Sequence, residues 1–97
     1  MTLEQFLDTL NNDQPGPQMS DLLAALWWQA NNDWERAHSI VQELDSKEAR
    51  WIHAYLHRFE GDKSNARYWY SRAHRTMPAQ SFDAEWEEIV SELLKSV

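Results

Sequence analysis

The stretch that decides the fold is residues 51–78, which read WIHAYLHRFEGDKSNARYWYSRAHRTMP. Apolar side chains recur at helical spacing in both halves of this stretch, and the halves meet at Gly61. Glycine tolerates the left-handed conformation that ends a helix, and Asp62 is placed to cap the next one. Pro78 disfavours helical geometry in the residue before it. Residues 51–78 therefore predict two helices joined by a tight turn.

The same helical periodicity extends to both ends of the chain. Thr2 and Ser20 are placed to cap helices, and the sequence Pro15-Gly16-Pro17 separates the first helix from the second. No stretch alternates long enough to predict a strand. We therefore expect one all-α domain, residues 1–97, with about six helices. It comprises an N-terminal helix in 1–12, helical hairpins in about 20–46 and 47–78, and a capping helix in 81–97.

The two predicted hairpins are related by an internal repeat of 29 residues. This shift pairs Asn32 with Gly61 and Asp33 with Asp62, and such a period is typical of helical-hairpin repeats. The second hairpin resembles half of a tetratricopeptide repeat in the spacing of Gly61, Asp62, Ala66, Tyr70, Ala73 and Pro78. Residues 53–73 also resemble small uncharacterised proteins of this kind, a resemblance that implies no activity.

The tetratricopeptide resemblance implies a non-enzymatic module that binds a protein or peptide. In such folds the first helix of each hairpin lines a concave face, which implies partner contacts at Trp28, Trp51, Tyr55 and Arg58. Trp28 follows Trp27 directly and so lies about 100° around the helix from it, where it either widens the buried stripe or contacts a partner. Trp27, Trp34, Trp51, Trp69 and Trp86 are expected between helices.

The formal charge of −7 is unevenly distributed along the chain. Residues 1–46 hold eight acids and one base, residues 47–75 hold seven bases and three acids, and residues 76–97 hold five acids and one base. One interpretation is that the basic middle pairs with its acidic flanks. The alternative is a groove in which Arg58, Arg72 and nearby aromatics bind an anionic partner. Overall acidity argues against nucleic acid.

His53 and His57 lie four residues apart, a spacing that places both imidazoles on one side of a helix. The glutamate of a helical zinc-protease motif is missing, and a third ligand would have to come from His38, His74 or a carboxylate. We therefore expect no metal and no cofactor. The two histidines are expected to form hydrogen bonds with Asp62 or the Tyr68 hydroxyl.

Two alternatives to the interaction module remain. One is a small-molecule- or metal-binding protein, with or without enzymatic activity, built on His53, His57, Arg58 and Arg72. The other is a self-assembling structural subunit, so that a monomer and a homodimer are both allowed.

No catalytic residue stands out. The chain has no cysteine and no nucleophile or phosphate-loop motif, and Glu85, Glu87 and Glu88 fit solvated acids at a helix N-terminus. The longest apolar run is seven residues, and the N-terminal stretch is acidic where a signal peptide is basic. These features predict a cytoplasmic protein that does not contact membranes.

Overall fold

The chain folds into six helices, as the sequence predicted, in a computed structural model that describes residues 1–95. Within these residues there is no strand. The helices are α1 (Leu3–Thr9), α2 (Asp21–Ala30), α3 (Trp34–Gln42), α4 (Lys47–Glu60), α5 (Lys63–Arg72) and α6 (Phe82–Lys95). Residues 96 and 97, which the predicted last helix included, lie outside the described residues. No helix in the described part is long and apolar enough to cross a lipid bilayer.

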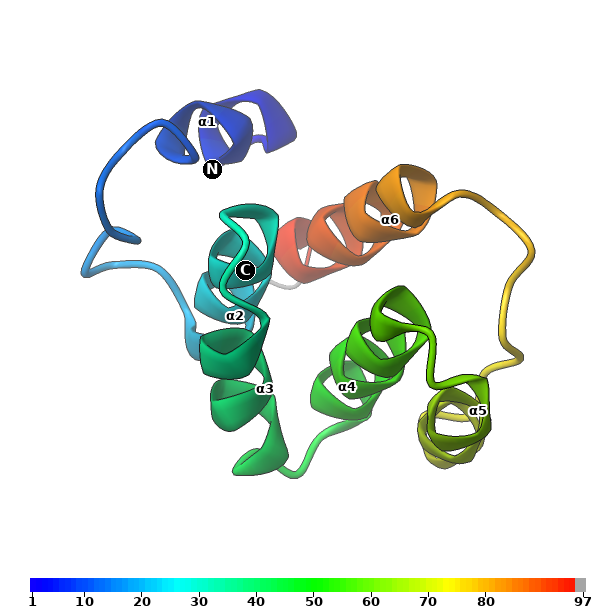
Figure 1. Ribbon diagram of the computed structural model, residues 1–97. Helices are drawn as coiled ribbons and strands as arrows, with labels where there is room; N and C mark the ends of the chain where they lie inside the picture. The colour runs from blue at the N-terminus through cyan, green and yellow to red at the C-terminus, as the bar shows by residue number, and fades with distance from the viewer. Residues whose placement is uncertain (96–97) are drawn as a thin grey trace.

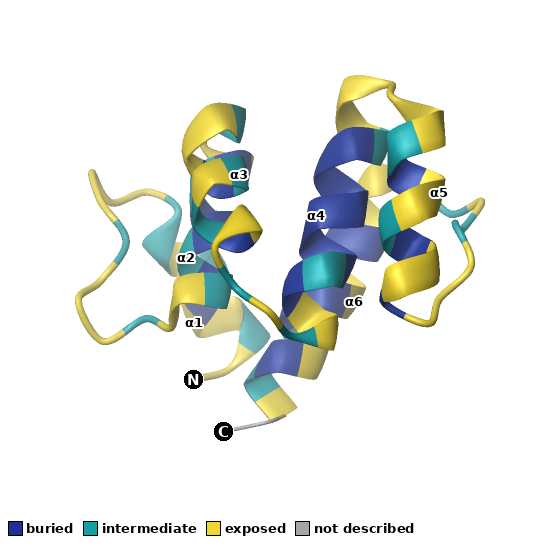
Figure 2. Cartoon of the chain, turned by 90° about the horizontal axis from the view of Figure 1, so that it is seen from below, coloured by how far each residue is buried: buried dark blue, intermediate teal, exposed yellow. Residues whose placement is uncertain are grey.

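Two antiparallel pairs, α2 with α3 and α4 with α5, form the body of the molecule, and α3 packs on α4 to join them (Figure 1). Helix α6 packs against the first helix of each pair, α2 and α4, and α1 packs against α6. Helix α4 is thus surrounded by α2, α3, α5 and α6, and it is buried along most of its length (Figure 2). This arrangement makes α4 the centre of the core.

Helix starts follow the capping residues that the sequence indicated. The Thr2 side chain accepts a hydrogen bond from the backbone N–H of Gln5, and the Gln5 side-chain oxygen accepts one from the backbone N–H of Thr2, forming a capping box. Ser20 caps α2 by a single bond, in which its side-chain oxygen accepts from the backbone N–H of Leu23. Helix α1 ends at Thr9, earlier than the expected range of 1–12.

The 29-residue repeat of the sequence corresponds to a repeated turn. Asn32 and Gly61 both adopt positive φ, at 67° and 94°. Directly after them, the backbone N–H groups of Asp33 and Asp62 each donate to the carbonyl five residues earlier, at 2.9 Å. This pattern is the Schellman ending of a helix. Each aspartate then caps the following helix, so one turn design connects both pairs.

Tryptophan side chains lie between helices and also tie them together. Trp27, Trp51 and Trp86 are buried as expected, whereas Trp34 and Trp69 are only partly buried. The indole N–H of Trp27 donates to the carbonyl of Thr9 at 2.9 Å, and that of Trp86 donates to the carbonyl of Leu26 at 3.3 Å. These bonds fix α1 and α6 on α2.

Candidate functional site

Three of the five side chains expected to contact a partner lie under α6. Trp51 and Tyr55 are only 4% and 2% exposed to solvent. Arg58 forms an ion pair with a carboxylate of α6. Helix α6 therefore occupies the face of α4 at which the resemblance implied a partner.

The other two expected contacts lie nearer the surface. Trp28 is half-buried beneath Arg36, whose guanidinium carbon lies 4.1 Å from the centre of a Trp28 ring. Arg72 is exposed and lies 5.7 Å and 5.5 Å from the ring centres of Tyr68 and Trp69. Both arginines thus make cation–π contacts within their own hairpin.

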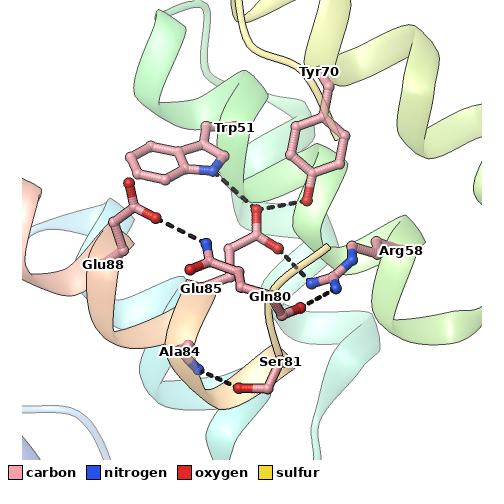
Figure 3. A network of polar contacts seen from close by, with 8 residues as sticks. All are labelled: Trp51, Arg58, Tyr70, Gln80, Ser81, Ala84, Glu85 and Glu88. Atoms are coloured by element: carbon pink, nitrogen blue, oxygen red, sulfur yellow. Dashed lines mark hydrogen bonds and ion pairs between the residues drawn. The ribbon is translucent and has the colours of Figure 1, made fainter. Parts of the chain in front are cut away.

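Glu85 is the polar centre of the buried face of α6 (Figure 3). The residue is 0% exposed, and its two carboxylate oxygens accept three hydrogen bonds. Oε2 accepts from the Trp51 indole at 3.1 Å and from the Tyr70 hydroxyl at 2.6 Å, and Oε1 accepts from Arg58 at 2.8 Å. Burial, together with the hydrogen bond to Glu85, raises the pKa of Tyr70. A buried carboxylate with this full set of donors holds α6 against α4 and α5.

The burial of Glu85 corrects the expectation that it is solvated like its neighbours Glu87 and Glu88. The available signal was its position four residues before Ile89, which places it on the apolar stripe of α6. The basic middle of the chain does pair with this acidic flank, through Arg58 with Glu85 and Arg75 with Glu88.

A groove of about 380 Å³ lies where α1, α2, α4 and α6 meet. Buried Tyr55 and Trp86 contribute to its lining, together with the more exposed Leu7, Leu10 and Phe59. Its volume lies within the range of pockets that hold small ligands or single side chains of a partner. We call it the α1–α6 groove; its remaining lining residues are Gln29, Ala30, Asn32, Asp83 and Glu87.

The α1–α6 groove contains one buried acceptor without a partner, with negative charge beside it. Gln29 is 8% exposed, and its Oε1 has no hydrogen-bond partner among the described residues. Asp83 and Glu87, both exposed, line the same groove. A buried acceptor without a partner costs free energy, and a ligand that donates a hydrogen bond would recover it. The groove therefore suits an apolar group that carries a donor or a positive charge.

The structure also brings His38 of α3 to the predicted histidine pair of α4. The Nε2 atoms of His38 and His53 lie 3.0 Å apart, and Nδ1 of His57 lies 2.7 Å from a carboxylate oxygen of Glu60. These partners differ from Asp62 and the Tyr68 hydroxyl, which the sequence suggested. His74, the other candidate third ligand, is not part of this cluster.

Comparison of the chain with protein-family models, with curated proteins and with solved structures returned no match. The groove, the histidine cluster and the charges around them are therefore the features that point to a function.

Proposed function

We propose that this chain is a non-enzymatic, tetratricopeptide-like interaction module that binds a short segment of another protein in the α1–α6 groove. The observation that carries the proposal is the groove itself, which combines apolar lining with the unpartnered Oε1 of Gln29. Peptide grooves on helical proteins commonly take an apolar anchor residue, with polar groups that fix its orientation.

The charges of the groove favour a cationic partner segment. Asp83 and Glu87 lie beside the apolar lining, and residues 1–46, which supply part of it, carry a net charge of −7. An aromatic or aliphatic side chain next to lysine or arginine would satisfy both features.

This partner differs from the anionic one that the arginines suggested. Arg58 is held by Glu85 and by the backbone carbonyl of Gln80, and Arg75 lies beside Glu88 and over a Trp51 ring. These contacts are made within the chain, which supports a structural role for both arginines. The remaining cationic candidate, Arg72, does not line the α1–α6 groove.

The test is selection of random linear peptides on the immobilised protein, followed by fluorescence polarisation of the enriched peptides. We expect enrichment of an apolar residue beside lysine or arginine. Glu87→Lys should weaken binding by at least about tenfold, since it reverses a charge at the groove. The matched control is Glu43→Lys, which makes the same change at an exposed residue outside the groove lining.

Two results would count against the proposal. Selected peptides without a shared apolar-basic pattern would show that the groove does not set specificity. Equal weakening by Glu87→Lys and Glu43→Lys would show that binding follows overall charge rather than the groove.

A further inference from the structure

Three imidazoles converge at the interface of α3 and α4, remote in sequence from the groove-lining residues of α1 and α6. One nitrogen from each of His38, His53 and His57 lies within 4.8 Å of the others. The rings of His53 and His57 are 4.9 Å apart, as expected for residues one helical turn apart, and His38 faces them at 4.7 Å and 5.3 Å. Two helices thus supply three nitrogen donors to one small volume.

Neighbouring indoles hold two of these imidazole rings in place. Trp34 stacks on His38 at 4.8 Å with an interplanar angle of 9°, and Trp69 stacks on His53 at 4.0 Å and 14°. Trp34 is itself fixed by a hydrogen bond from its indole N–H to the carbonyl of Leu56, at 2.8 Å. The donor nitrogens are therefore oriented before any ligand arrives, which lowers the entropic cost of binding.

The contact between His57 and Glu60 selects one nitrogen of the third ring. A carboxylate 2.7 Å from Nδ1 accepts a proton held on that atom. The lone pair of the neutral ring then lies on Nε2. Histidine ligands of metal ions are typically oriented in this way, with the other ring nitrogen donating to a carboxylate.

The contact between His38 and His53 leaves a nitrogen lone pair facing the cluster. A 3.0 Å contact between the Nε2 atoms of His38 and His53 needs a lone pair on at least one of them. Burial, with smaller contributions from His38 and His57, lowers the pKa of His53 to about 4. Burial and nearby His57 also lower the pKa of His38.

We propose that His38, His53 and His57 form a binding site for a divalent first-row transition-metal ion, zinc in particular, with Glu60 orienting His57. Zinc–nitrogen bonds of about 2.0–2.1 Å in a tetrahedral arrangement place the ligand nitrogens about 3.3–3.4 Å apart. The separation of 3.0 Å for one pair, and the limit of 4.8 Å within which the other two pairs lie, are compatible with this distance. Small side-chain adjustments would complete the site, and imidazole is a preferred ligand of zinc, copper and nickel.

A route for the ion lies beside the cluster. A hollow of about 250 Å³ reaches His53 and Trp69, and it is lined on its other side by residues at the end of α3. Three protein ligands would leave a fourth coordination position for water or a further ligand, as in zinc sites that are not purely structural.

The experiment is calorimetric titration of the untagged, metal-free full chain with zinc, supported by the visible spectrum of a cobalt(II) complex. We expect one equivalent to bind with submicromolar affinity and cobalt to give the intense absorption of tetrahedral coordination. Loss of an outer-shell carboxylate typically weakens metal affinity by about 10–100-fold. We therefore expect Glu60→Gln to fall in that range and His38→Gln to weaken binding further.

The matched control is His74→Asn, which removes the one histidine outside the cluster. His74 is exposed with a φ of 59°, a conformation that asparagine tolerates. Circular dichroism of each metal-free variant verifies folding, and Glu60→Gln, on the surface, provides a folded variant if His38→Gln unfolds.

Three outcomes would overturn the proposal. The first is zinc affinity no better than that of a peptide with two histidines. The second is a folded His38→Gln variant that binds zinc like the parent. The third is equal weakening by His74→Asn and His38→Gln, which would indicate nonspecific surface binding.

Discussion

Replacing Glu85 with alanine removes the one acceptor shared by three buried or partly buried donors. Trp51, Tyr70 and Arg58 all donate to its carboxylate, at 3.1, 2.6 and 2.8 Å. Breaking a buried ion pair by removing one partner typically costs about 3–5 kcal/mol, because the other charge stays buried without compensation. That is a large part of the roughly 5–15 kcal/mol that stabilises an ordinary domain. At about 4–8 °C per kcal/mol for a chain of this size, Tm should fall by at least about 12 °C.

The assay is urea unfolding followed by circular dichroism, with thermal melting as a second measure. Glu87→Ala is the matched control, two residues along the same helix and exposed, and should change stability by less than about 0.5 kcal/mol. Tyr70→Phe should cost about 1–2 kcal/mol in the parent and less in the Glu85→Ala background, since the two residues share one hydrogen bond. A Glu85→Ala variant within about 1 kcal/mol of the parent, at an unchanged m-value, would refute the assignment of Glu85 as the anchor of α6.

Three further outcomes are expected. Gly61→Val should lower the free energy of unfolding, measured in urea, by about 1–2 kcal/mol, because a branched side chain disfavours the φ of 94°. Gly61→Asn should lower it by less, and equal losses of stability in the two variants would argue against a conformational cause. The pKa of His53 is about 4 when folded and 6.5 when unfolded, so the metal-free protein should lose up to about 3 kcal/mol of folding stability as the pH falls from 6.5 towards 4. The same loss in a His53→Gln variant would exclude this cause. A chain ending at Pro78 lacks α6 and exposes the core beneath it, so its thermal unfolding should no longer be cooperative. A soluble fragment that unfolds at the same temperature and as cooperatively as the parent would show that the core does not need α6.

Features that depend on neighbours in the chain were predictable from the sequence. The capping box at Thr2 and the left-handed turn at Gly61 each follow from residues within one helical turn. The pairing of Asn32 with Gly61 in the sequence repeat likewise corresponds to the same backbone turn. At these positions the backbone conformation that the residues favour locally is the one that the folded chain adopts.

Features that depend on packing between distant segments were not predictable in the same way. His38 is 15 residues from His53, and only the packing of α3 on α4 brings their Nε2 atoms to 3.0 Å. Glu85 is 34 residues from Trp51, and its charge made a solvated position the better expectation. The same packing of α6 buries Trp51 and Tyr55, which the repeat pattern alone would place on an open face.

The position of the histidine cluster has a consequence for how the two repeated units cooperate. His38 belongs to the second helix of one unit, whereas His53 and His57 belong to the first helix of the next. In repeat proteins, total stability is approximately a sum of the intrinsic stability of each unit and an interface contribution from each junction. The cluster lies in the junction. Protonation of His38 and His53 would therefore act chiefly on the coupling between units, and would change the sharpness of unfolding as well as its midpoint.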